Sequence, residues 1–590
     1  MTLTEARPAE GGSRPSPTDQ VSPVGQAVVD SADHKVVGLV FIGVSLVLFL
    51  ALRAVGSALG AELLTAGSQV VGGDSRRFYS LYETGMVLLW ATPIWMGLAT
   101  YVLPLQIGSS RLAFPRVQAF ALWTHVGGAA LFVLGHLIDP PPGIGLTDRN
   151  PMLAPVGGIN DGTNLILASF LLLGFATLLA AGNLLATALT MRTEGMSLGR
   201  MPLFSWGVVA AAVGSLFATP VFLASSLLLY IDLHFAGTNL FVGGRAADLV
   251  WQKGLWLYGR PEALLLLVPA LGAACDIVVT VARRPLLAPP PPPVPRGLKA
   301  KLPPLPGLTV PLHGHVLAAG ALFAATAFAL LTWVQDRRAL RAVILPTASV
   351  ATGLFAVAAG LLVLLWLTTL RGEAKDGGAR TKVQPTLALG FVAAAVAVGL
   401  LAAANAAVAG LAGVHGTELG QGMIELITIG VPTLLAFGAL HHWAKKLFGA
   451  PLSNATGGLT LLASLGGTVA LGVGQSIAGY ADGAVHATAA EGDAKLGYSL
   501  AQAGHVLLLL AGILITLDVF RALAARRDDR TTPADLGDGV TLEWAAPSPP
   551  PPGNFTQLPE VRSEAPLVGL PKAKAPKRGS SMRDSTRKGR

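Results

Sequence analysis

The chain has 590 residues, of which 52% are hydrophobic and only 13% are charged, and its formal net charge is +9. This composition, with a mean hydropathy of +0.59, excludes a soluble globular protein and indicates a membrane protein. The single cysteine, Cys275, excludes an intramolecular disulfide and a cysteine-cluster metal site.

The N-terminal residues 1–34 are polar and rich in proline and serine, so we expect them to be disordered. They lack the apolar stretch of a cleaved signal peptide. Residues 35–523 then contain about twelve apolar runs, each long enough to cross a bilayer in roughly 20 residues. The runs begin near Val36, Glu83, Val117, Asn164, Ser205, Trp256, Thr309, Leu340, Thr386, Gln421, Gly457 and Leu500. Because lipid offers no partner to free backbone groups, these runs predict an all-α, polytopic membrane protein.

Lysine and arginine gather in the loops that follow even-numbered helices, such as the pairs Arg192 with Arg200 and Lys445 with Lys446. Such loops face the cytoplasm in most membrane proteins. The proline-rich loop at 286–307 is therefore expected to be an extended cytoplasmic linker. An even number of helices then leaves both termini in the cytoplasm.

Residues 524–590 form a basic, proline-rich tail that ends KAKAPKRGSSMRDSTRKGR. Few large apolar residues and several prolines predict that this tail is disordered and cytoplasmic. Contact between its positive charge and anionic lipid or an acidic partner is the alternative. Nothing in the sequence indicates a nucleic-acid partner.

Several segments resemble subunit I of the haem-copper oxidases, which include cytochrome c oxidase. TGMVLLWATPIWMGLATYVLPLQIGSSRLAFPR, from Thr84 to Arg116, looks like the second helix and its following loop. MRTEGMSLGRMPLFSW, from Met191, is similar to the loop that joins helices four and five, and YGRPEALLLLVPALG, from Tyr258, to the sixth helix. The resemblance implies a twelve-helix bundle in the plasma membrane of a bacterium, in a respiratory, electron-transporting context.

In this family the low-spin haem is held by one histidine on helix two and one on helix ten, and the high-spin haem by a further histidine on helix ten. The resemblance places Thr84, Glu425 and Met423 at these positions. The family has His-Gly-Met where this chain has Thr84-Gly85-Met86, and His-Phe-His where it has Met423-Ile424-Glu425. None of the three haem ligands is retained.

The copper ligands of the family are also replaced. Arg260 stands for the histidine of a His-Pro-Glu motif on helix six, and Ala329-Leu330 for a pair of histidines on helix seven. A guanidinium has no lone pair to offer a metal. Glu262 is the one family residue of catalytic type that is retained. The resemblance therefore predicts no bound metal, with haem and copper present only if the chain is an active oxidase.

The charged residues at the lost ligand positions predict a buried ion pair between Arg260 and Glu425. Arginine does not shed its proton, so burial without a partner would be strongly unfavourable. Three histidines within the predicted spans, His125, His136 and His505, leave open an unrelated b-type haem site; hydrogen bonds between helices are the alternative role for them.

Three functions follow from these observations. The loss of all ligands favours a metal-free pseudoenzyme, a structural or regulatory subunit beside other membrane proteins. Such partners include an oxidase-type subunit II or a ligand-complete subunit I. Family membership alone would instead imply an active terminal oxidase that couples electron transfer to proton pumping. Buried arginine and glutamate residues also permit an ion or solute pathway.

Overall fold

The computed structural model describes residues 31–64, 70, 75–138, 161–235, 262–286, 314–331, 347–371, 374–376, 379–381, 386–411, 422, 425–482, 494–525 and 539–568. Within these residues, twelve helices are long and apolar enough to cross a membrane. The prediction of a twelve-helix, all-α membrane protein is confirmed. The only strands in the described part are a three-residue antiparallel pair, β1 (Ala374–Asp376) and β2 (Ala379–Thr381).

The helices follow the predicted runs, with starts displaced by several residues at some positions. In chain order they are α2 (His34–Leu64), α3 (Ser75–Gly85), η2 (Met86–Ala91), α4 (Thr92–Gln106), α5 (Pro115–Ile138), α6 (Asp161–Thr190), η3 (Leu198–Arg200), α7 (Leu203–His234), α9 (Leu267–Ala282), α10 (Gly314–Leu331), α11 (Thr347–Arg371), α12 (Leu387–Leu411), η4 (Glu425–Gly430), α14 (Val431–Phe448), α15 (Asn454–Asp482), α16 (Ala494–Ala524) and η5 (Leu542–Ala545).

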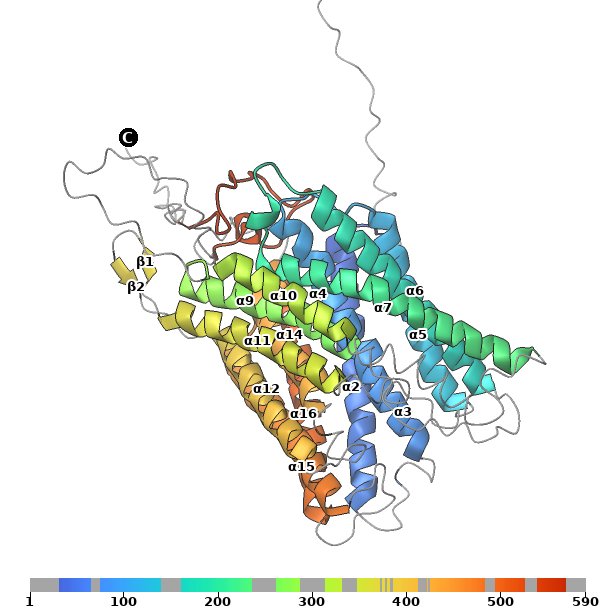
Figure 1. Cartoon of the computed structure of the whole chain (residues 1–590). Coiled ribbons are helices and arrows are strands. Elements are labelled where there is room, and N and C mark those ends of the chain that lie inside the picture. Colours follow the sequence, from blue (N-terminus) through green and yellow to red (C-terminus); the bar gives the residue numbers. More distant parts are fainter. Residues whose placement is uncertain are drawn as a thin grey trace, which may run out of the picture.

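Neighbouring helices pack in sequence around the bundle. The helices α5, α6 and α7 lie side by side on one flank, and α12, α15 and α16 form the other (Figure 1). The second, sixth and tenth spans, Phe78–Gln106, Glu262–Ala282 and Glu425–Phe448, have 100%, 89% and 83% of their most apolar stretch buried inside the protein. Among the other spans that the structure describes, none exceeds 56%. These three helices therefore form the core of the bundle.

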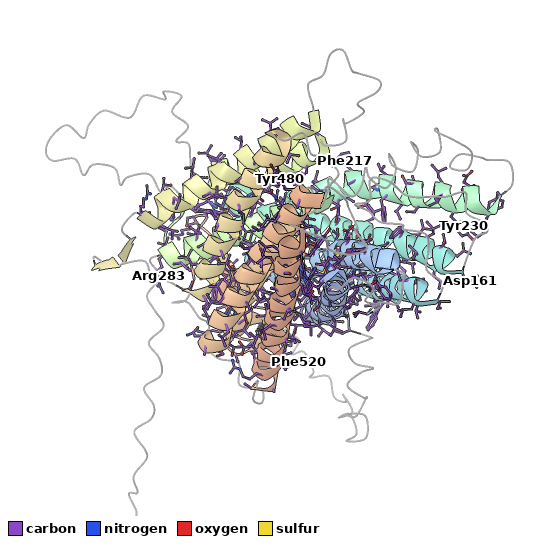
Figure 2. All side chains as sticks on the ribbon, turned by 90° about the horizontal axis from the view of Figure 1, so that it is seen from below. Asp161, Phe217, Tyr230, Arg283, Tyr480 and Phe520 are labelled. Carbon is purple, nitrogen blue, oxygen red and sulfur yellow. The ribbon has the colours of Figure 1, made fainter. Side chains whose placement is uncertain are left out.

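The outer helices carry large apolar side chains on the surface. Phe217 on α7, Tyr480 on α15 and Phe520 on α16 are 62%, 73% and 59% exposed, and they lie on the outside of separate helices (Figure 2). Exposed apolar groups on helices of this length suit contact with lipid chains. The described part of the chain is thus a multi-pass membrane protein.

Two of the three core spans contain a stretch of π-helix. The second span widens at η2 and the tenth at η4, and each π-helix is followed at once by an α-helix with proline in its first turn, Pro93 in α4 and Pro432 in α14. Proline lacks an N–H group and its ring crowds the preceding turn, so it disturbs the regular hydrogen-bond ladder. A π turn absorbs this disturbance. The two widened segments contact one another in the core.

The helices α15 and α16 approach so closely that only glycine fits at their crossing. A Cβ added to Gly474 on α15 would lie 2.4 Å from the backbone nitrogen of Ala501, and one added to Gly504 on α16 would lie 2.4 Å from the backbone nitrogen of Leu471. Small residues at such contacts let helix backbones meet inside a membrane, where van der Waals packing drives association.

Part of the C-terminal tail is folded, so the prediction of disorder is wrong for residues 539–568. Val540, Leu542 and Trp544 are 3%, 0% and 4% exposed. The segment packs against the loop before α7, where Arg200 donates to the Val561 carbonyl at 3.2 Å (Figure 1, red). The average composition of the tail concealed a short apolar string, VTLEWAA, that is long enough to be buried.

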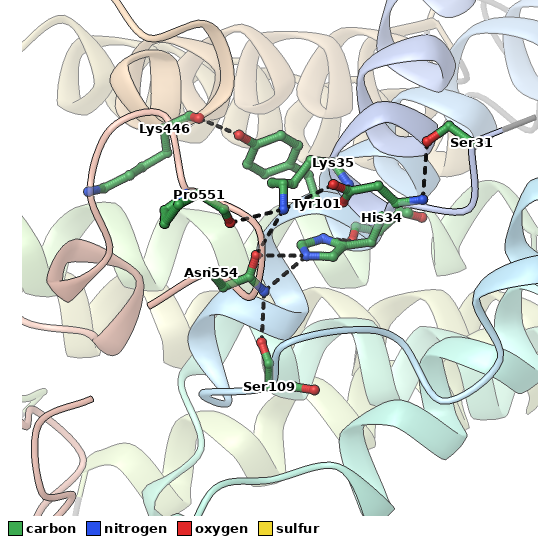
Figure 3. A network of polar contacts seen from close by, with 10 residues as sticks. Ser31, His34, Lys35, Tyr101, Ser109, Lys446, Pro551 and Asn554 are labelled. Atoms are coloured by element: carbon green, nitrogen blue, oxygen red, sulfur yellow. Dashed lines mark hydrogen bonds and ion pairs between the residues drawn. The ribbon is translucent and has the colours of Figure 1, made fainter. Parts of the chain in front are cut away.

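Asn554 attaches this segment to the start of the first span. Its amide lies 3.1 Å from His34 Nε2 and donates to the Ser109 carbonyl at 2.7 Å. Lys35 donates to the Pro551 carbonyl at 3.3 Å (Figure 3). The folded C-terminal segment is therefore hydrogen-bonded to the start of the first span. The rest of the predicted tail, the N-terminal residues 1–30 and most of the 286–307 loop lie outside the described residues.

Candidate functional site

The core brings two of the predicted site residues to facing segments. Thr84 is fully buried in the last turn of α3, directly before η2. Glu425 is the first residue of η4 and is 7% exposed. The Tyr82 hydroxyl, two residues before Thr84, forms a hydrogen bond with the Glu425 carboxyl. The second and tenth spans therefore meet directly at Tyr82 and Glu425.

A buried arginine completes this contact. Arg53, on α2, is 1% exposed, and its Nη1 donates to the Tyr82 hydroxyl at 2.5 Å. Its guanidinium carbon lies 5.3 Å from the centre of the Phe49 ring and 5.6 Å from that of Tyr82, a cation–π geometry. It also interacts electrostatically with Glu425. We call Arg53, Tyr82 and Glu425 the central triad.

His505, on α16, borders the central triad. Its ring meets the Tyr82 ring edge-on, with 5.4 Å between centroids. The ring is 6% exposed, and its Nδ1 has no hydrogen-bond partner among the described residues. His505 therefore joins α16 to the central triad through the packing of its ring against Tyr82.

Beyond the central triad, aromatic and hydroxyl side chains close the space between the two core spans. Trp90 Nε1, in η2, donates to Thr433 Oγ1, in α14, at 2.9 Å. The Trp90 ring lies 4.4 Å from Phe49 and 5.9 Å from Phe437 between centroids. All three rings are fully buried. The second and tenth spans are therefore held together here by direct contacts between their side chains.

The residues that the resemblance assigns to the low-spin haem offer poor donors to a haem iron. Such a haem needs an imidazole or comparable nitrogen or sulfur donor on each face of its iron. Thr84 offers a hydroxyl, and Glu425 offers a carboxyl group that is already engaged by Tyr82 and Arg53. Within the described ranges, no three His, Cys, Asp or Glu side chains are grouped so that they could hold a metal ion.

The remaining replaced positions are only partly described. Ala329 and Leu330 lie in α10, where Ala329 is fully buried; an alanine and a leucine offer no donor atom to copper. Arg260 and Met423 lie outside the described residues. The predicted pair between Arg260 and Glu425 therefore stays a prediction, while Arg53 is a cation that the structure does place near Glu425.

The three candidate histidines do not gather into one site. His125 and His136 share α5, and His505 belongs to α16. His136 Nδ1 faces the Phe132 carbonyl at 2.8 Å and its Nε2 faces Ser80 at 3.3 Å, whereas His125 packs edge-on against Phe41. Their roles here are contacts between helices.

Glu262, which the resemblance gives as a retained family residue, lies at the start of the sixth span and is 2% exposed. It borders a cavity of about 70 Å³, lined mainly by apolar side chains with the hydroxyls of Thr92, Thr177 and Ser215. A space of this size has room for several waters. The cavity lies between the second, fourth, fifth and sixth spans, apart from the residues of the central triad.

Arg53 and Tyr82 are the residues of the central triad that the sequence analysis missed. A lone arginine within the apolar string LFLALRAVG is a sign of a buried functional or structural charge, because charged groups are costly inside a membrane. Its partners could not be read from the string, since they come from the second and tenth spans.

In comparison with known proteins, the chain is similar to subunits I of bacterial cytochrome c oxidases. Residues 36–290 match the family model described as cytochrome c and quinol oxidase polypeptide I. A putative cytochrome c oxidase subunit 1-beta from Streptomyces avermitilis is 29% identical over 576 residues, which cover 95% of each chain. A cytochrome c oxidase subunit 1 from Corynebacterium diphtheriae is 26% identical, with 94% of each chain covered. A probable subunit 1-alpha from S. avermitilis is 26% identical over 92% of this chain and 88% of its own.

Proposed function

Because this chain belongs to the haem-copper oxidase subunit I family, we propose that it is a metal-free member that acts as a structural or regulatory subunit of a respiratory-type membrane complex. Family membership supplies the scaffold and its setting among other membrane subunits. The chemistry of the family depends on haem and copper, since no side chain alone transfers electrons to oxygen. What the chain can do therefore depends on whether it holds these groups.

The central triad is the observation that carries the proposal. Tyr82 and Glu425 join the two helices that bear the low-spin haem ligands in the family, and Arg53 balances the charge of Glu425. The interactions of the Glu425 carboxyl group with Tyr82 and Arg53 stabilise the bundle without a cofactor. The pattern supports coordinated replacement of a cofactor site by side chains.

The proposed partners are an oxidase-type subunit II and a ligand-complete subunit I. S. avermitilis has relatives with both the 1-alpha and the 1-beta name, so two chains of this kind can occur in one organism. If the chain keeps the family scaffold but not the metal ligands, its function depends on the outer helix faces and loops that contact other subunits. The basic residues after 568, outside the described structure, offer a further contact that salt would weaken.

Purification of a tagged chain in mild detergent tests the proposal. We expect haem, from a pyridine haemochrome assay, and copper, from metal analysis, to be far below one per chain, and mass spectrometry to recover other membrane subunits. The relative from C. diphtheriae, prepared in the same way, is the control. Near-stoichiometric haem or copper would refute the metal-free claim. A lone metal-free monomer in repeated preparations would refute the subunit role and favour the ion or solute pathway.

We also propose that both termini face the cytoplasm. The positive loops after even-numbered helices and the twelve spans support this orientation. Reporter fusions after Arg590 and within the loop that contains Lys299 should both give a cytoplasmic signal, and a fusion between the first and second spans should give the opposite one. A periplasmic signal at either of the first two positions would contradict the topology.

A further inference from the structure

Two carboxyl groups from distant parts of the chain meet at one end of the core. Glu543 lies in η5, within the folded C-terminal segment 539–568, and Asp276 lies in α9. Glu543 is 0% exposed and Asp276 is 2% exposed. The segment therefore carries an acidic side chain from outside the spans into a place that water does not reach.

Gln106, the last residue of α4, bridges the two acids. Its Nε2 donates to Asp276 Oδ2 at 2.7 Å and to Glu543 Oε1 at 3.3 Å. Its own Oε1 accepts from Ser205 Oγ at 2.7 Å, which fixes the orientation of the amide. The two carboxyl groups are near enough to interact electrostatically. Two negative charges this close and this buried would repel strongly.

The surroundings assign different charge states to the two acids. Asp276 also accepts from the backbone N–H groups of Leu203 and Phe204 at 3.1 and 3.2 Å. These are free N–H groups at the start of α7, where the helix dipole favours an anion. Asp276 is therefore the better position for a negative charge.

Glu543 has the opposite arrangement. Its Oε1 accepts from Gln106, from Trp443 Nε1 at 3.2 Å and from Thr541 Oγ1 at 2.8 Å. Its Oε2 is buried and has no hydrogen-bond partner among the described residues. An ionised carboxylate would place half of its charge on that oxygen with no donor and no water, at a high desolvation cost. A carboxylic acid, with Oε1 as the carbonyl and Oε2 as the hydroxyl, fits better.

We propose that Asp276 and Glu543 form a proton-binding site, in which one proton held on Glu543 keeps residues 539–568 docked on the membrane domain. The acids come from the two parts that dock, so the proton bound between them acts as part of the interface. The site is separate from the central triad, and it does not depend on whether the chain binds haem.

The titratable groups that face the docked segment near Trp544 are Lys446 and His442, both on α14. His34, Lys35 and Arg200 face it farther along, at Asn554, Pro551 and Val561. Lys446 Nζ donates to the Ala546 carbonyl at 2.5 Å and lies 5.5 Å from the centre of the Trp544 ring. The His442 ring lies 5.3 Å from that of Trp544. The lysine charge is thus already directed at a carbonyl of the segment, and loss of the proton from Glu543 would leave two carboxylates bridged by the neutral amide of Gln106.

The direction of the pH effect follows from linkage. Burial away from water raises the pKa of Glu543 in the docked state, whereas in an undocked segment it returns to about 4.3. The docked state then binds more protons, so docking is strongest below the undocked pKa and weakens as pH rises through the docked one. One linked proton changes the docking equilibrium by up to about tenfold per pH unit between these two values.

Hydrogen–deuterium exchange of the full chain in nanodiscs tests the site. Protection of peptides from 539–568, corrected for intrinsic exchange, should fall as pH is raised from about 5 to about 9. In Glu543→Gln, a neutral isostere, protection should not depend on pH. In Asp276→Asn, protection should fall over a narrower interval of pH than in the native chain. Replacement of sodium by potassium in the buffer at constant pH should leave the protection of these peptides unchanged.

Three results would overturn the proposal. They are pH-independent protection in the native chain, an unchanged pH dependence in Glu543→Gln, and a dependence on the identity of the alkali cation. If the segment of Glu543→Gln is unprotected at every pH, the infrared spectrum of the native chain decides. A protonated-carboxyl band that disappears together with protection supports the site, and the absence of such a band refutes it.

Discussion

Arg53→Leu is expected to lower the free energy of unfolding by roughly 3–5 kcal/mol, because removal of one member of a buried charge pair leaves the other without compensation. Arg53 is 1% exposed and lies against Tyr82, Phe49 and Glu425. Glu425→Leu should cost a comparable amount, since it leaves the guanidinium alone. The double variant should cost much less than the sum of the two, because an apolar pair needs no charge balance.

Thermal unfolding of the four proteins in one detergent measures this double-mutant cycle. Arg562→Leu is the control, because the pair between Arg562 and Glu560 is exposed and its loss should leave the melting temperature unchanged. A parallel cycle with Arg260→Leu asks whether the predicted Arg260–Glu425 pair contributes as well. Additive effects of Arg53→Leu and Glu425→Leu would show that these two residues do not form a charge pair.

Gly474→Ala is expected to destabilise the bundle by about 1–3 kcal/mol, and Gly474→Leu to prevent stable folding. An added Cβ would lie 2.4 Å from the backbone nitrogen of Ala501 and 2.6 Å from the carbonyl oxygen of Gly497. Both obstacles are backbone atoms of α16, so no side-chain rotation can relieve the clash. The two helices would have to separate and lose their contact.

Gly466→Ala, on the same helix, is the matched control. The nearest atom to its added Cβ is Leu507 Cδ1 at 3.7 Å, which is an ordinary contact. Because alanine favours helix more than glycine does, this variant should be unchanged or more stable by up to about 1 kcal/mol. The two variants are compared by melting temperature and by yield of monodisperse protein. Equal behaviour would mean that α15 and α16 are not in backbone contact at Gly474.

The sequence was sufficient to predict the twelve spans because a membrane span depends on a local property, the apolar length needed to cross lipid. The bounds were less accurate where proline perturbs a helix. The second span begins several residues before Glu83 and widens at Met86–Ala91, and the effect of Pro93 on the preceding turn could have been anticipated only in part.

Residues of the candidate site could be predicted only where a family sequence motif covers their position. The sequence analysis names Thr84 and Glu425 because family motifs point to these positions, and the structure brings their segments together. Arg53 was missed because a charge on one helix gains meaning only from partners on two others. Glu543 was missed for a different reason: a few buried residues inside a polar tail do not alter its average composition.

Titration of the purified apo chain with haemin tests the central claim most directly, since it asks whether the core can accept a haem. The claim predicts that added haemin gives no low-spin absorption spectrum and no saturation near one haem per chain, both in the native chain and in Arg53→Leu. Stoichiometric binding with a low-spin spectrum that is lost on substitution of Glu425 or His505 would contradict it.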